Sequence, residues 1–351
     1  MSVPGVIMQF TGKDNPFTYT LTGLIFSCVF CIAVFITWYT TWEAKDVPQE
    51  SDFKVDNQRS SGILNHLKYL VLDLFSSFRI RAFRLHIIIY IFSFTAMDVF
   101  GSVFTYYVVY CLSQDAAAVS GWLSIAAFAS VPGTYGFMLL LNRLNVTPSA
   151  ALRLSYGCIF CVLAFLFTVY LTKTQVPTLL FSAVFILLGA ARSGLYYIPW
   201  NIYSFIPDID EMVTQQRREG IFAGVMVLTR KSTVAIAIMI IDLVLQESGF
   251  VKGSGAQPES ALGAIIGLMI FATAALLAVS FFTTYKFKLT RETHKLLLKE
   301  IARRKLGGDY RDCDTNTRLI IKQLTGYEYD QVWGGDATRR TVGSAHLSPV
   351  K

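Results

Sequence analysis

Charged side chains are scarce in this chain. They make up 16% of its 351 residues, whereas hydrophobic residues make up 53% and include 27 phenylalanines. A soluble domain of this length could not hide so much apolar surface from water. Apolar runs of about 20 residues recur instead, which is the length that a helix needs to cross roughly 30 Å of hydrocarbon. The composition therefore excludes an ordinary soluble protein and predicts an all-α polytopic membrane protein.

Motifs of enzymes and metalloproteins are also missing. The sequence has no H-E-x-x-H, no Gly-rich phosphate loop and no evident Ser/His/Asp arrangement. Its four histidines are scattered. The two C-x-x-C pairs, Cys28/Cys31 and Cys158/Cys161, lie in apolar runs, where small side chains suit contacts between helices. We therefore expect neither an enzyme nor a metal site.

Seven apolar segments are long enough to span a membrane. They divide the chain into an outside lead with the first membrane helix (1–42), a basic link with an amphipathic helix (43–84), a six-helix bundle (85–287) and a tail (288–351) whose end we expect to be disordered. The lead lacks the pattern of a signal peptide. The tail contains a predicted helix over Arg291–Lys305 and a second helical piece over Thr315–Leu324. The predicted spans are about 19–42, 85–112, 119–141, 151–171, 177–206, 220–246 and 261–287.

Basic residues predict the orientation of these spans. Twenty-five of them lie in segments on one side, namely the link, the loop with Arg143, the loop with Arg217 and the tail. Only 3, Lys13, Lys173 and Lys252, lie on the other side. Because Lys and Arg concentrate in cytoplasmic loops, we expect an outside N-terminus and a cytoplasmic tail in a cell (inner) membrane.

Four charged residues are predicted to lie well inside the membrane. A rise of 1.5 Å per residue places Asp98, Arg192 and Lys231 at depths of roughly 16–22 Å, and Arg230 directly precedes Lys231. An unpaired charge there costs from about 3 to over 10 kcal/mol. These side chains should face one another, as an ion pair that only fixes helix packing, or line a polar cavity for a solute or ion. Arg230 and Lys231 point about 100° apart, so they cannot share one partner.

The stretch 196–231 combines several polar features. Pro199 interrupts the helix predicted over 177–206, and Tyr196, Trp200 and Asn201 lie beside it. These residues could stack on and hydrogen-bond to a sugar ring, or they could be interfacial and packing residues. A charged loop follows on the cytoplasmic side, which could close that side of the protein or could be a solvated loop. Its candidate gate residues are Asp208, Glu211, Arg217 and Glu219.

At these residues the sequence resembles the glycoside–pentoside–hexuronide:cation symporters, the melibiose-permease-like branch of the major facilitator superfamily. The pattern is Asp208-x-x-Glu211, then Arg217-x-Glu219-Gly220, then Lys231 eleven residues after the glycine. The resemblance implies that Lys231 is a pocket lysine near sugar and cation sites. It also implies that Asp208, Glu211 and Arg217 belong to a cytoplasmic gate. No cofactor is implied beyond a coupling cation, Na⁺ or H⁺.

The chain departs from this family in length, because the family has twelve membrane helices. The seven spans match only about helices six to twelve, so we expect an N-terminally truncated or split symporter chain that needs a missing N-terminal half. The expected function is secondary active transport of a sugar or glycoside, uronide-like or related, and the expected partners are this small molecule and the lipid bilayer. The alternative, from another class of function, is a seven-helix receptor or a non-transporting scaffold. We expect no nucleic-acid partner.

Overall fold

The computed structural model describes residues 16–41, 74–114, 116–173, 176–252 and 254–333. All regular structure in these ranges is helical. The chain forms two units, 1–67 and 68–351, and each is described by itself. The outside lead, most of the amphipathic helix predicted in the basic link and the last fifteen residues lie outside the described ranges.

The first unit contributes one helix, α2 (Pro16–Thr40). Its window Gly23–Thr40 has a mean hydropathy of 2.0 and no Asp, Glu, Lys or Arg. A 25-residue helix is about 37 Å long, enough to cross the hydrocarbon of a bilayer. The first predicted span is therefore a helix of suitable length and composition.

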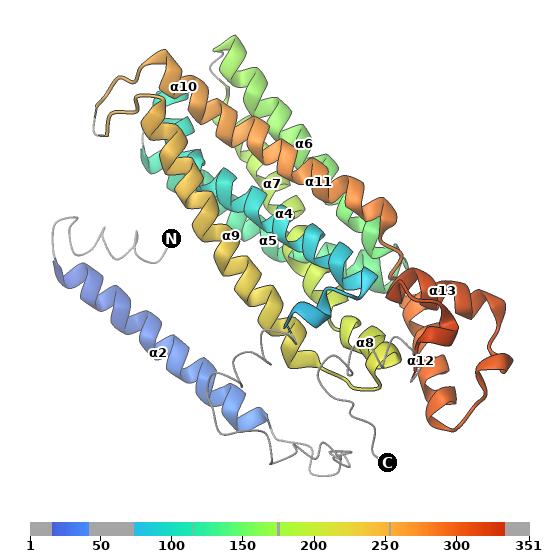
Figure 1. The fold of residues 1–351 in the computed structure, drawn as a ribbon. Coiled ribbons are helices and arrows are strands. Elements are labelled where there is room, and N and C mark those ends of the chain that lie inside the picture. The colour runs from blue at the N-terminus through green and yellow to red at the C-terminus, as the bar shows by residue number, and fades with distance from the viewer. Residues whose placement is uncertain (1–15, 42–73, 115, 174–175, 253, 334–351) are drawn as a thin grey trace, which may run out of the picture. The chain divides into compact units, whose positions relative to one another are not determined.

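The second unit carries six more helices of membrane-spanning length (Figure 1), so the prediction of seven spans in an all-α membrane protein is confirmed. Two of the six contain a π-helical turn, at Tyr107–Cys111 and at Gly267–Ala272. The spanning elements are α4 (Arg81–Tyr106) with its π turn, α5 (Ala116–Asn142), α6 (Pro148–Thr172), α7 (Thr178–Tyr203), α9 (Glu219–Glu247), and α10 (Glu259–Ile266) joined through the second π turn to α11 (Thr273–Lys286).

Helix α4 forms the centre of this bundle and packs against α7, α9 and α11. Its buried face holds large apolar side chains, Phe83 and Phe104 among them. One polar cross-link joins three helices: Ser93 of α4 is 2.8 Å from the Tyr156 hydroxyl of α6 and donates to Ser280 of α11 at 3.2 Å. Such interhelical hydrogen bonds hold membrane helices together. Hydrophobicity alone does not, because an apolar helix surface contacts lipid tails as favourably as it contacts another helix.

Helices α5 and α7 make the most extensive contact in the bundle because small residues let their backbones approach closely. A Cβ atom on Gly189 would lie 2.0 Å from the carbonyl oxygen of Ala126. A Cβ atom on Gly133 would lie 2.7 Å from the Cα atom of Ala190. The two helices therefore approach so closely at Gly133 and Gly189 that no larger side chain fits there.

The expectation that Pro199 interrupts the fifth predicted span is wrong. Helix α7 is continuous through Pro199 and ends at Tyr203. Proline removes one backbone hydrogen bond, but neighbouring helices compensate for this inside a membrane protein. The charged segment after it is also not a simple loop, because a short helix, α8 (Ile206–Thr214), carries Asp208 and Glu211.

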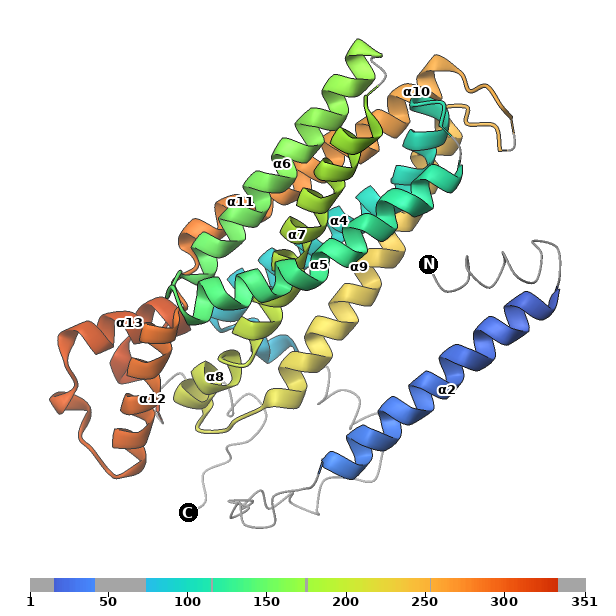
Figure 2. The same ribbon diagram turned by 180° about the vertical axis from the view of Figure 1, so that it is seen from behind.

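The tail folds at the α8 end of the bundle (Figure 2). It contains α12 (Arg291–Lys305), as expected, and α13 (Thr315–Thr325), with 3₁₀ turns at Tyr310–Asp312 and Tyr329–Gln331. Thr290 and Asp314 cap the two helices. The Trp333 amide donates to the Met212 carbonyl at 3.0 Å, so the tail is attached to α8.

Candidate functional site

An aromatic cluster lies between the cytoplasmic halves predicted for α4 and α7. Tyr90 and Phe94 of α4 have ring centroids 4.5 Å apart. Each also contacts α7: Tyr90 meets Trp200 edge-on at 5.9 Å, and Phe94 meets Tyr196 edge-on at 4.5 Å. These edge-to-face contacts fix the side chains that α7 presents at this level.

Asp98 and Arg230 form an ion pair next to this cluster. The Arg230 Nη1 and Nη2 atoms lie 2.5 Å and 2.9 Å from the two Asp98 carboxylate oxygens. The Arg230 guanidinium also lies over the Phe94 ring, 5.2 Å from its centroid. Both charged side chains are mostly buried, with exposures of 24% and 19%. The structure therefore brings together two of the four charges predicted to lie inside the membrane.

Arg192 contacts the aromatic cluster through Tyr196. Its guanidinium donates to the Tyr196 hydroxyl at 3.1 Å, one turn along α7, and lies 5.1 Å from the centre of that ring. Within the described residues it has no acidic partner. Arg192 is thus linked to the cluster through Tyr196 and keeps its positive charge uncompensated.

Lys231 is not part of the Asp98 ion pair. The packing of α9 against α4 turns Arg230 toward Asp98, and the next residue then points away by about 100°. Lys231 is exposed and forms neither a hydrogen bond nor an ion pair within the part of the chain that the structure describes. It shares its exposed face with Val227 and Leu228.

A groove runs along α5 and α7 beside the cluster. It has a volume of about 490 Å³ and a wide opening. It contains all three polar or aromatic candidates that the sequence singled out next to Pro199, Tyr196, Trp200 and Asn201. Trp200 is 43% exposed. The full lining consists of Thr134, Ser193, Tyr196, Tyr197, Trp200 and Asn201.

The predicted gate residues form a charge network at the α8 end. Arg217 lies 3.3 Å from Asp208 and 2.8 Å from Glu219. Glu211 does not join that network and instead pairs with Lys305 of α12 at 2.6 Å. The structure therefore brings three of the four candidates together and places the fourth in a neighbouring pair.

Sequence reasoning missed the tail's part in this network. His294 of α12 lies 2.7 Å from Asp208 and stacks on Phe205 at 4.2 Å. It also missed a bidentate pair on α8, where Arg218 makes two hydrogen bonds of 2.8 Å and 2.7 Å to the buried Asp210. His294 and Lys305 are eleven residues apart, three helical turns, and this spacing on one face of α12 was the available signal.

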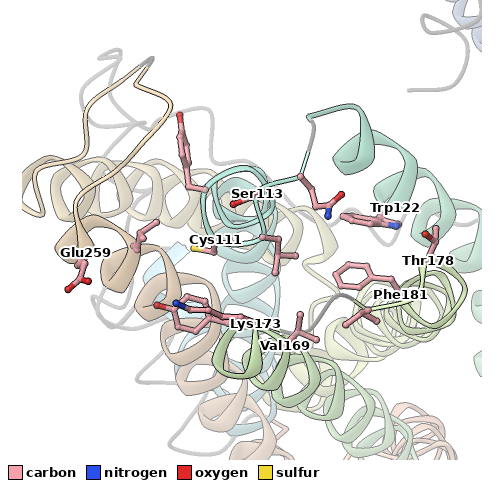
Figure 3. Close-up of a pocket in the computed structure, with 14 residues that line it drawn as sticks. Cys111, Ser113, Trp122, Val169, Lys173, Thr178, Phe181 and Glu259 are labelled. Atoms are coloured by element: carbon pink, nitrogen blue, oxygen red, sulfur yellow. The ribbon is translucent and has the colours of Figure 1, made fainter.

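A further cavity lies at the opposite end of the bundle from α8. Figure 3 shows the residues that line it. It has a volume of about 1000 Å³ and lies among the last residues of α6 and the first turns of α5, α7 and α10. Trp122 and Phe181 pack together on one side, with ring centroids 4.3 Å apart, and Lys173 and Glu259 lie elsewhere on its wall. It contains no residue that the sequence analysis singled out as functional.

Residues able to bind a metal are not grouped in the described ranges. Within them there is no set of three or more His, Cys, Asp or Glu side chains placed to hold a metal ion. The local chemistry is instead that of paired charges, aromatic rings and hydroxyl groups. Such groups bind and orient a polar solute without covalent chemistry.

Comparisons with known proteins agree with this arrangement. Residues 1–291 match the family described as MFS/sugar transport protein. An uncharacterized symporter of Synechocystis sp. (strain ATCC 27184 / PCC 6803 / Kazusa) is 28% identical over 261 residues, which are 72% of this chain and 46% of the relative. The chain thus spans about half the length of the curated relative that it matches. The chain belongs to the MFS/sugar transport family, a family of membrane transporters and not of enzymes.

Proposed function

We propose that this chain contributes the second half, plus one helix, of a sugar or glycoside symporter coupled to Na⁺ or H⁺. The observation that carries the proposal is the cluster of Asp98, Arg230, Arg192 and Tyr196 beside an open groove in the bundle. Buried charges of this kind are costly in a membrane and are retained where a solute or ion pathway needs them. Because the chain covers 46% of the Synechocystis relative, we propose that helices outside this chain complete the pathway.

The balance of charge supports an acidic sugar derivative, such as a uronide, as the substrate. Three basic side chains, Arg192, Arg230 and Lys231, lie in the middle part of α7 and α9, and one acid, Asp98, neutralises only one of them. A substrate carboxylate provides charge-assisted hydrogen bonds to guanidinium or ammonium groups. Trp200 and Tyr196 offer faces for the sugar ring, and Asn201 offers an amide.

The network around α8 is proposed as the gate that closes this end during transport. Arg217 joins Asp208 to Glu219, and so it connects α8 to the first turn of α9. Rocking of one bundle against another requires contacts that form in one state and break in the other. We assign this end, the tail included, to the cytoplasm, because 25 of the basic residues lie on this side and 3 on the other.

The proposal is tested by replacing Lys231 in the transporter that contains the complete set of helices. We expect Lys231→Ala to abolish cation-coupled uptake of a labelled hexuronide while expression stays normal. Lys252→Ala, an exposed lysine in the loop at the opposite end, is the matched control and should transport as the unaltered protein does. A neutral glycoside tested in parallel separates loss of binding to the carboxylate from loss of all transport.

Two results would contradict the proposal. Unchanged uptake by the Lys231→Ala variant would contradict the proposed role of this lysine in recognising the substrate carboxylate. Recruitment of a protein partner in response to ligand, without any flux of solute, would instead favour the receptor or scaffold function.

A further inference from the structure

Five basic side chains gather where α5, α6, α11 and α12 meet. The two segments that supply them, 141–156 and 282–291, contain no acidic residue. We call this group the basic rim, and it consists of Arg143, Arg153, Lys286, Lys288 and Arg291.

Three contacts hold the two segments of the basic rim together. Arg291 donates a hydrogen bond to the Asn142 side chain at the end of α5. The Ser149 hydroxyl, in the first turn of α6, donates to the Phe287 carbonyl at 3.0 Å. The Arg153 guanidinium lies over the Tyr285 ring, 4.7 Å from its centroid. The rim is therefore a built feature of the bundle's α8 end, assembled from residues more than 130 positions apart.

The basic rim is open to its surroundings. Arg143, Lys286 and Lys288 are exposed, and Arg153 and Arg291 are partly exposed. Within the described residues, none of the five forms an ion pair with an acidic side chain. Glu292, at the start of α12, is the one acid next to the rim in sequence. The rim thus carries several positive charges without matching negative ones.

The basic rim lies at the ends of three spanning helices, where lipid headgroups are expected. The spanning helices begin or end at this level, at Asn142, Pro148 and Lys286. Large apolar side chains lie beside it on the outer surface of the bundle, with Phe282 66% and Tyr285 54% exposed. Cations above exposed apolar side chains match a phospholipid, whose phosphate lies above its acyl chains.

We propose that the basic rim binds the headgroup of an anionic phospholipid in the leaflet at the α8 end of the bundle. The phosphate accepts hydrogen bonds from Arg153, Lys286 and Lys288, and the acyl chains lie along Phe282 and Tyr285. A bound lipid would then bridge α6, α11 and the segment that leads into α12, and so hold the tail against the bundle. This inference concerns a site separate from the groove and does not depend on the transported substrate.

The test is lipid retention by the purified full chain. The chain is incubated in detergent with equal amounts of phosphatidylglycerol and phosphatidylcholine, and native mass spectrometry counts the bound lipids. We expect the unaltered chain to retain phosphatidylglycerol preferentially. The triple variant Arg153→Gln, Lys286→Gln, Lys288→Gln should lose this preference by roughly tenfold or more, because each basic residue near the membrane surface contributes to attraction of anionic lipid.

A matched control removes the same charge elsewhere. The variant Lys173→Gln, Lys252→Gln, Lys322→Gln changes three exposed lysines outside the rim and should keep the preference. If the triple rim variant does not fold, the double variant Lys286→Gln, Lys288→Gln, which changes only exposed side chains, gives the same comparison.

Three outcomes would overturn the proposal. They are equal retention of the two lipids by the unaltered chain, an unchanged preference in the rim variants, and displacement of phosphatidylglycerol by inorganic phosphate at millimolar concentration. The last result would show a site for small anions instead of a lipid.

Discussion

The ion pair between Asp98 and Arg230 allows a quantitative test of how α4 and α9 are held together. The Asp98 side chain is 24% exposed and the Arg230 side chain is 19% exposed. Removing either one leaves the other charge mostly buried and without its partner. Breaking a buried pair in this way costs about 3–5 kcal/mol, whereas replacing both partners by apolar residues is often neutral or stabilising. We therefore expect Asp98→Leu and Arg230→Met each to lower the free energy of unfolding by about 3–5 kcal/mol.

The double variant distinguishes an ion pair from two independent contributions. Asp98→Leu with Arg230→Met should unfold no more easily than either single variant, although it also loses the contact of Arg230 with Phe94, worth roughly 1 kcal/mol. The assay is unfolding of the purified chain by SDS in mixed micelles, followed by circular dichroism. Asp242→Leu, which removes an exposed acid from α9, is the control and should change stability by no more than about 0.5 kcal/mol. Costs that add in the double variant would refute the reasoning.

Three further predictions concern helix packing and the tail. Gly133→Val should destabilise the chain by roughly 1–3 kcal/mol because its side chain meets α7, whereas Gly136→Val on the same helix enters open space and should be nearly neutral in the same assay. Glu211→Lys should speed amide hydrogen exchange in α8, because the ion pair of Glu211 with Lys305 is lost. Adding Lys305→Glu should restore the original exchange rate. If the rate is not restored, the pair is not formed. Burial raises the pKa of Glu300, but hydrogen bonds from Arg303 and Tyr329 outweigh it and leave that pKa below its ordinary value. Ionised Glu300 therefore stabilises the tail at pH values above its ordinary pKa of 4.5. This stability is lost as the pH falls through the lower pKa of the folded state. Thermal unfolding at decreasing pH should show the loss for the original chain but not for Glu300→Gln.

Much of the architecture was predictable from the order of residues alone. The seven spans follow from apolar runs, and α12 follows from helical spacing, because both depend on neighbours within a few turns of one helix. Pro199 shows the limit of such local reasoning. Proline interrupts an isolated helix, but α7 stays helical through Pro199 to Tyr203. Membrane helices tolerate proline because neighbouring groups satisfy the freed backbone carbonyl.

The partners of the charged residues were not predictable in the same way. Arg230 and Lys231 are predicted at nearly the same depth in the membrane, so by depth alone either could pair with Asp98. The rotation of α9 against α4 makes Arg230 the partner. His294 lies 86 residues from Asp208 in sequence, so their contact exists only because α12 folds back onto α8. The gate candidates Asp208, Arg217 and Glu219 were found from the sequence because they lie within twelve residues of one another.

The sequence by itself thus determined that this membrane protein has seven segments long and apolar enough to span a bilayer, with charges inside them, because hydrophobic length and charge are properties of single segments. Among the described residues, the tertiary structure decided which charges pair with each other and which do not. Pairing requires atoms to meet within about 3 Å, and the packing of α4, α7 and α9 sets those distances. Asp98 and Arg230 are paired for this reason, and Lys231 is left exposed.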